Sequence, residues 1–284
     1  MTINARTQLF FLLGNPVDHS LSPAMHNAAF SALKINSVYL ACPVEEKRIG
    51  AAVESIRALS VGGANVTSPY KDQVIPYLDT LSAEAENLQA VNTIINRNGY
   101  LYGEITDGEG CYRALLESSP ATIGAGLSYL IIGLGGAARA VVTSLNRYGA
   151  KGIYIANRTL DKAKAWSERL VNERPALASG YLPLQQSKLI EAIEKCDVLI
   201  YGLPVDDSAL LSALAAMPKF ADKKRLFDMR YHPETTALMT AFRKNGGHAE
   251  NGLSMLLWQA VLSFELFTSQ QAPVEVMRLA LNTV

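Results

Sequence analysis

The sequence predicts a two-domain α/β protein, and two features of the chain lead to this prediction. Short apolar runs alternate with amphipathic stretches along most of its length, which is typical of βα units and a parallel sheet. Its 284 residues also exceed one typical domain of roughly 100–200 residues. We therefore expect a first α/β domain with a mainly parallel sheet and a second α/β domain inserted into it.

The first hundred residues alternate between strand and helix patterns. We expect strands at Gln8–Leu13, Ser37–Cys42, Gly63–Val66 and Val91–Ile95, and helices at Pro23–Leu33 and Lys47–Leu59. Proline near the first turn of a helix is tolerated because the amide hydrogen it lacks has no partner there. The segment Asn96–Gly99 indicates a hairpin turn.

The inserted domain begins where the composition changes, near residues 105–125. Residues 118–126 are rich in Ser, Pro and Gly, and the apolar run Tyr129–Ile132 that follows is typical of a strand covered on both faces. The return lies near residues 245–252, before an apolar helix at Gly252–Phe267 that we expect to pack on the first domain. The expected bounds are 1–106 with 250–284 for the first domain, and 107–249 for the second.

Composition excludes several classes of function. Lys+Arg and Asp+Glu both total 26, so the chain has no general positive field for nucleic acid or an anionic membrane. We expect a small-molecule ligand and a monomer or homodimer. Three separate cysteines and a short apolar run at Leu9–Leu13 favour a cytoplasmic protein. The four histidines show no ligand spacing, so no metal is expected.

A glycine-rich turn predicts dinucleotide binding. Gly133, Leu134, Gly135, Gly136, Ala137 and Ala138 follow the strand Tyr129–Ile132 and open a helix that runs to about Tyr148. This matches the G-x-G-x-x-G/A fingerprint of a Rossmann domain, in which glycines allow the backbone to approach a pyrophosphate at a helix N-terminus. The alternative is a glycine-rich turn needed only for packing.

The next strand predicts which dinucleotide binds. Gly152–Ala156 is followed by Asn157, Arg158 and Thr159, with Lys162 one turn further on. An NAD site usually offers a carboxylate here, whereas a guanidinium can pair with the 2′-phosphate of NADP. We therefore expect NADP, the alternative being a solvated basic loop.

Polar side chains gather at segment ends in the first domain. Ser20 and Ser22 lie at a helix start and could hold a carboxylate, although N-capping is the commoner reason for such residues. Lys71 follows the strand Gly63–Val66, and Asn92 and Asp107 lie at similar strand ends. The carboxyl edge of a parallel sheet is the usual place for a ligand.

Taken together, these motifs resemble those of the shikimate dehydrogenase family, in the family's order and over nearly the whole chain. The matching segments are Gly14–Pro16, His19–Asn27, Asn65–Lys71, Ala90–Thr93, Gly133–Ala137, Asn157–Thr159 and Gly252–Gln259. The resemblance implies a catalytic α/β domain, an inserted Rossmann domain that binds NADP, and reversible reduction of 3-dehydroshikimate to shikimate.

The resemblance also implies a role for individual residues. Ser20 and Ser22 would hold the substrate carboxylate, and Lys71 would be the acid/base group paired with Asp107. The ring hydroxyls would be bound by Thr67, Asn92, Asp107 and Gln259, with Tyr231 closing over the ring. The cofactor would be contacted by Gly133, Leu134, Gly135, Gly136, Ala137, Asn157, Arg158, Thr159, Lys162, Met229 and Gly252.

A lysine suits the implied reaction on chemical grounds. Hydride arriving at a carbonyl carbon creates an alkoxide, which a positioned ammonium group can stabilise and protonate. A neighbouring carboxylate keeps the lysine oriented and charged. No metal is needed for this step.

Four positions depart from the family pattern. Ile105 replaces the family's Asn before Thr-Asp, and Gln89 replaces the Gly before Ala-Val-Asn. Tyr201 and Leu203 stand where the family has polar groups beside the nicotinamide. Loss of a polar partner in a buried site costs on the order of 1–3 kcal/mol, so Ile105 is expected to lower turnover of shikimate.

Three functions therefore stay open at this point. The first is shikimate dehydrogenase, or a paralogue acting on quinate or an aminated shikimate. The second is a non-catalytic NADP-binding sensor, which the presence of both Lys71 and Asp107 disfavours. The third is an NADP-dependent reductase of an unrelated small hydroxy acid. Activity on a panel of cyclic polyols separates them.

Overall fold

The computed structural model describes residues 3–118, 126–220 and 224–283. They form two compact units, residues 1–110 with 256–284 and residues 111–255. The domain bounds expected from the sequence differ from these by a few residues. None of the helices in the described ranges is long and apolar enough to cross a membrane.

The first unit is built on a six-stranded sheet of order β2-β1-β3-β5-β6-β4. Its strands are β1 (Gln8–Gly14), β2 (Ser37–Pro43), β3 (Gly63–Val66), β4 (Thr80–Leu81), β5 (Thr93–Arg97) and β6 (Tyr100–Glu104). Its helices are α1 (Ser22–Ala32), α2 (Ile49–Ala58), α3 (Ala83–Leu88), α10 (Leu253–Thr268, mostly in this unit) and α11 (Val274–Leu281), with 3₁₀ turns η1 (Glu46–Arg48) and η2 (Ile75–Tyr77).

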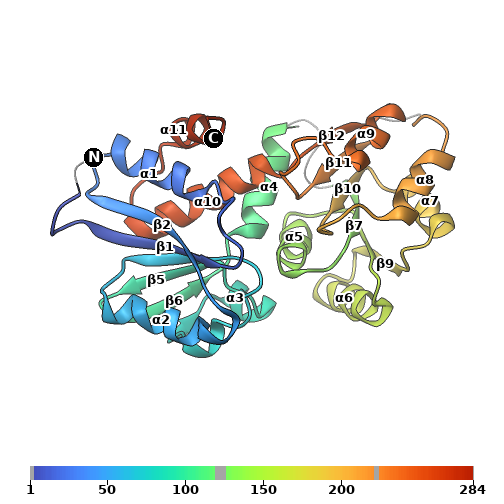
Figure 1. Ribbon diagram of the computed structural model, residues 1–284. Coiled ribbons are helices and arrows are strands. Elements are labelled where there is room, and N and C mark those ends of the chain that lie inside the picture. The colour runs from blue at the N-terminus through green and yellow to red at the C-terminus, as the bar shows by residue number, and fades with distance from the viewer. Residues whose placement is uncertain (1–2, 119–125, 221–223, 284) are drawn as a thin grey trace. The chain divides into compact units, whose positions relative to one another are not determined.

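This sheet is mixed. β1 pairs in parallel with β2 and β3, whereas β5 pairs antiparallel with both β3 and β6. The reason is the expected hairpin, whose turn at Asn98 and Gly99 has left-handed backbone at both residues and so matches the twist of two adjacent strands. Figure 1 shows α1, α10 and α11 on one side of the sheet and α2 on the other.

The second unit is a six-stranded sheet of order β12-β11-β10-β7-β8-β9, with every pairing parallel. Its strands are β7 (Ser128–Ile132), β8 (Gly152–Ala156), β9 (Ala178–Leu182), β10 (Val198–Tyr201), β11 (Arg225–Asp228) and β12 (His248–Glu250). Its helices are α5 (Gly136–Arg147), α6 (Leu160–Glu173), α7 (Gln186–Lys195), α8 (Ser208–Ala216) and α9 (Ala237–Lys244), and it contains most of α4 (Asp107–Ser118).

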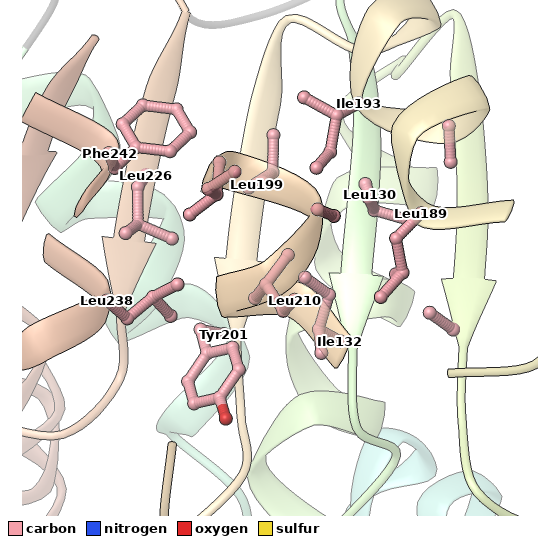
Figure 2. Close-up of a cluster of buried hydrophobic side chains, with 14 of the residues drawn as sticks. Leu130, Ile132, Leu189, Ile193, Leu199, Tyr201, Leu210, Leu226, Leu238 and Phe242 are labelled. Atoms are coloured by element: carbon pink, nitrogen blue, oxygen red, sulfur yellow. The ribbon is translucent and has the colours of Figure 1, made fainter. Parts of the chain in front are cut away.

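This strand order is that of a Rossmann domain, with β7 as its first strand. Alternate residues of β7, β10 and β11 pack against α7, α8 and α9 in one buried apolar cluster (Figure 2). Tyr129 and Ile131, on the opposite face of β7, are equally buried. Coverage of both faces explains why this strand is a continuous apolar run.

Most elements begin and end within two residues of their expected bounds. The helix expected at Lys47–Leu59 instead starts as η1 and continues as α2. The strand expected from Val91 begins at Thr93, because the amides of Val91 and Asn92 bond to the carbonyls of Lys71 and Glu104.

Candidate active site

Topology brings Lys71, Asn92 and Asp107 to one edge of the first sheet. β3 and β6 lie on either side of β5 and both run antiparallel to it, so they run in the same direction. The end of β3, the start of β5 and the end of β6 therefore meet. Lys71 follows β3, Asn92 precedes β5 and Asp107 opens α4 after β6.

Lys71 and Asp107 form a close ion pair. The distance from Lys71 Nζ to Asp107 Oδ2 is 2.5 Å, and the two side chains are 21% and 7% exposed. Asp107 lies in the first turn of α4, where the helix dipole favours a negative charge. The carboxylate thus orients the ammonium group while part of the lysine still reaches solvent.

Asn92 holds the other oxygen of this carboxylate. Its Nδ2 donates to Asp107 Oδ1 at 3.0 Å and to Thr106 Oγ1 at 2.9 Å, and its Oδ1 accepts from the amide of Thr106 at 2.9 Å. The side chain is 2% exposed. Asn92, expected to bind a ring hydroxyl, is here bonded to Asp107 of the ion pair and to the neighbouring Thr106.

Thr67 lies beside the start of the loop that carries the serines. Its amide bonds to Leu13 O, and a Cβ on Gly14 would be 2.3 Å from its Cγ2. Glycine at position 14 therefore permits this close approach.

The two serines lie at the start of α1 without capping it. The N-cap residue is Leu21, with no side-chain capping bond, and Ser20 Oγ accepts from the amide of Ser22 at 3.3 Å. Simple N-capping therefore does not account for the two hydroxyls. Ser22 is buried and Ser20 is half-buried.

Two further residues that were expected to bind the substrate lie outside the strand ends of the first sheet. Gln259 is half-buried on α10, where its Nε2 donates to Leu256 O. Tyr231 is half-buried in the loop after β11, in the second unit, and burial raises the pKa of its phenol.

The glycine-rich turn has the form that a dinucleotide requires. Gly133 has φ +89°, and a Cβ there would be 2.6 Å from Leu203 Cδ2, so only glycine suits the position. Gly135 precedes α5, and a Cβ on it would meet no atom within 4 Å. The first amides of α5, from Gly136 and Ala137, lack intrahelical partners, so a phosphate can reach them.

The residues after β8 are open to solvent. Arg158, Thr159 and Lys162 are exposed, and Asn157 Nδ2 donates to Thr159 O at 3.0 Å. Within the described ranges the Arg158 guanidinium has no ion-pair partner. The charge is therefore available to an anionic ligand.

Met229 and Gly252 lie together at the carboxyl edge of the second sheet. A Cβ on Gly252 would be 2.2 Å from Met229 O, and one on Gly202 would be 3.3 Å from Met229 Sδ. This close packing explains the glycine at position 252.

Three of the four residues that depart from the family pattern can be described from their surroundings. Tyr201 is fully buried, and its hydroxyl donates to Val205 O at 2.6 Å. Ile105 is 5% exposed, and its hydrocarbon side chain offers no polar group to a ligand. Gln89 ends α3 with φ +49°, which explains the family's glycine there.

Arg230 is an internal ion-pair residue. Its guanidinium binds Asp228 at 2.6 Å and Asp206 at 2.7 Å and lies 4.8 Å from the ring centroid of Tyr201. It is thus already neutralised within the unit.

Sequence reasoning gave no role to three buried polar residues beside the ion pair, namely Asn65, Thr106 and Ser263. Each forms several hydrogen bonds in the first unit. The one sequence signal for Ser263 is its spacing of four residues from Gln259, which places both on one face of a helix.

His26 packs in the core of the first unit. Its ring stacks on Tyr39 at 4.3 Å, and burial lowers its pKa to about 3. Neither ring nitrogen has a hydrogen-bond partner in the described parts of the chain. Across the same ranges no three His, Cys, Asp or Glu residues are grouped as metal ligands.

Comparison with known proteins extends over nearly the whole chain. Residues 12–94 match the family described as shikimate dehydrogenase substrate binding domain, residues 123–226 match shikimate/quinate 5-dehydrogenase, and residues 252–281 match the shikimate 5′-dehydrogenase C-terminal domain. The shikimate dehydrogenase (NADP(+)) of Desulforamulus reducens is 39% identical over 99% of this chain and 96% of its own.

Solved structures agree with this assignment. Shikimate 5-dehydrogenase from Listeria monocytogenes, in complex with shikimate and NAD, has a TM-score of 0.85 and 33% identity, covering 98% of this chain and 97% of its own. Quinate dehydrogenase from Corynebacterium glutamicum, in complex with NAD, has a TM-score of 0.84 and 27% identity, covering 98% and 99%. With the Rossmann turn, the Lys71–Asp107 pair and these full-length matches in place, the chain belongs to the shikimate dehydrogenase family.

Proposed function

We propose that this chain is an NADP-dependent shikimate dehydrogenase that interconverts 3-dehydroshikimate and shikimate. The observation that carries the proposal is the 2.5 Å Lys71–Asp107 pair, an acid/base group held by a carboxylate in a family of oxidoreductases. The curated relative from Desulforamulus reducens carries the same activity in its name.

NADPH, when bound, supplies the hydride. Its phosphates would fit the turn at Gly133–Ala137, where a Cβ on Gly135 would meet no atom within 4 Å and the first amides of α5 lack intrahelical partners. Arg158, which is exposed, would pair with the 2′-phosphate, and Asn157, Thr159 and Lys162 would help to hold it. Met229 and Gly252 would contact the nicotinamide part.

The residues of the first unit bind the substrate and move the proton. Ser20 and Ser22 hold the carboxylate, and Thr67, Asn92, Asp107 and Gln259 hold ring hydroxyls. As the carbonyl carbon receives hydride, its oxygen takes the proton from Lys71 Nζ and becomes the hydroxyl. In the reverse direction neutral Lys71 accepts that proton, and Asp107 keeps the ammonium group oriented.

The test follows NADPH by its absorbance with shikimate and with quinate, each with NADP and with NAD. We expect turnover of shikimate with NADP to be fastest. Faster turnover of quinate would replace the substrate and keep the mechanism. Binding of NADP without turnover of either compound would overturn the proposal in favour of a sensor or another substrate.

A further inference from the structure

Ser263 joins helix α10 to the polar interior beside the ion pair. The residue is fully buried, and its hydroxyl donates to Gln259 O at 2.9 Å. Its Oγ accepts from Asn65 Nδ2 at 2.9 Å and lies 2.9 Å from Thr93 Oγ1 and 3.3 Å from Thr106 Oγ1. One hydroxyl therefore lies within hydrogen-bond distance of groups from β3, from β5 and from the residue before α4.

From Ser263 a short series of hydrogen bonds leads to Asp107. Thr106 Oγ1, beside Ser263, accepts from Asn92 Nδ2 at 2.9 Å. The same amide nitrogen donates to Asp107 Oδ1 at 3.0 Å, and Asp107 Oδ2 binds Lys71. The position of the carboxylate therefore depends on the orientation of the Asn92 amide.

The backbone on either side of Asp107 lies close to α10. Thr106 Oγ1 lies 3.2 Å from Gln259 O, so Thr106 and Ser263 share one carbonyl of α10. A Cβ on Gly110 would be 2.7 Å from Gln259 N, which shows how closely the start of α4 approaches α10. Gly110 permits the approach, and the Ser263 and Thr106 hydroxyls both lie at the Gln259 carbonyl.

Asn65 ties this network to the centre of the sheet. Its Nδ2 donates to Asn92 O at 3.0 Å, and its Oδ1 accepts from the hydroxyl of Tyr39 at 2.8 Å. Burial raises the pKa of Tyr39, so this hydroxyl stays a donor at neutral pH. Buried networks of this kind hold one geometry when every member is bonded, and removal of one member leaves the others unsatisfied.

We propose that Ser263 is a positioning residue for the Lys71–Asp107 pair, acting through Thr106 and Asn92. The proposal rests on the proposed function of that pair and adds to it a residue of α10 that lies outside the Gly252–Gln259 motif. Ser263 holds the carboxylate in the one orientation that directs the Lys71 ammonium group, without contact to the substrate.

The principal test compares Ser263→Ala with Thr268→Ala. Thr268 lies on the same helix and makes the same type of bond, to Phe264 O at 2.8 Å, away from the ion pair. We expect Ser263→Ala to lower kcat about tenfold, the scale of one buried hydrogen bond, with the Kd for NADP unchanged. Ser263→Thr, which keeps the hydroxyl, should restore most of kcat. Equal losses in Ser263→Ala and Thr268→Ala would overturn the proposal.

A double-mutant cycle separates positioning from a general structural effect. If Ser263 acts through Asp107, Ser263→Ala should change kcat less than about twofold once Asp107 is already Asn. The same tenfold loss in both backgrounds would contradict the proposal. Should Ser263→Ala fail to fold, Ser263→Cys, of similar size and weaker hydrogen bonding, takes its place with the same expected outcomes.

A readout without turnover keeps this proposal separate from the proposed function. Wild-type protein inactive on shikimate and quinate would refute the function alone. The ¹⁵N resonance of the Lys71 ammonium group, assigned with Lys71→Ala, reports the ion pair directly. It should shift in Ser263→Ala and not in Thr268→Ala, and an unshifted resonance in Ser263→Ala would refute the positioning role.

Discussion

In the first unit the candidate catalytic side chains bond to one another, whereas in the second unit the side chains expected to bind the cofactor lie open. Asp107 uses both carboxylate oxygens, and Asn92 uses its oxygen and its amide nitrogen. Arg158 and Lys162 are exposed, and the glycine-rich turn offers backbone rather than side chains.

This difference follows from what each unit has to do. A proton donor works only within hydrogen-bond reach of the reacting oxygen, so its partners must hold it there before the substrate arrives. A dinucleotide brings its own charge and many contacts, so a shaped backbone and one or two free cations are sufficient to bind it. Substitutions should therefore affect kcat in the first unit and cofactor affinity in the second.

The largest expected effect is in the first unit. Lys71→Ala removes the proton donor, and general acid/base groups contribute roughly 10²–10⁴-fold, so kcat should fall about a thousandfold. The Kd for NADP, measured by fluorescence, should stay within twofold. Lys34→Ala, at an exposed lysine of the same unit, is the control. Turnover within tenfold of the wild type would show that Lys71 is not the acid/base group.

His26 is an exception to the well-bonded interior of the first unit, and it predicts a pH effect on stability. Burial lowers its pKa from 6.5 to about 3, so below pH 6.5 the unfolded chain binds a proton that the folded chain does not. Stability is therefore fully present above pH 6.5 and is lost as pH falls towards 3. Between pH 7 and 5 the loss from His26 should be about 2 kcal/mol.

Urea unfolding of His26→Phe at both pH values tests this. The apolar ring suits a site formed by Tyr39, Phe30 and Phe264, and the variant should lose about 2 kcal/mol less on acidification than the wild type. His19→Phe, at an exposed histidine, should keep the full dependence. If the wild type and His26→Phe lost the same free energy of unfolding between pH 7 and 5, the pKa of His26 would not be lowered by burial.

In the second unit the expected effect is smaller and selective. Arg158→Gln should weaken NADP binding about tenfold, because an exposed charge-assisted bond to phosphate contributes on the order of 1–2 kcal/mol. NAD binding, which lacks that phosphate, should change less than twofold. Lys164→Gln on the exposed side of α6 is the matched control. A loss of equal size for both dinucleotides in a calorimetric titration would assign Arg158 a general role.

The sequence predicted the order of strands and helices well because burial of both sheet faces leaves continuous apolar runs, as in β7. The mixed pairing of the first sheet follows from the hairpin, whose turn was recognised. Ser263 could not be assigned a role because its partners are distant in sequence, up to 198 residues for Asn65. The ion pair of Arg230 with Asp206 could not be predicted either, since local pattern does not give the distance between loops.

Gln89 should show the smallest effect and marks where the first unit carries local strain. A non-glycine residue at φ +49° costs about 1 kcal/mol or more, and glycine there loses part of that gain through the greater freedom of the unfolded chain. Gln89→Gly should therefore stabilise the protein by about 0.5–1 kcal/mol, a rise in Tm of roughly 1–4 °C. Gln89→Ala keeps the Cβ and loses the bond from Gln89 Nε2 to Glu86 O, so it should give no rise. Equal rises in Tm in both variants would trace the gain to loss of the amide side chain. The value of kcat should be unchanged in both, because position 89 is exposed and lies outside the hydrogen-bonded network around Asp107.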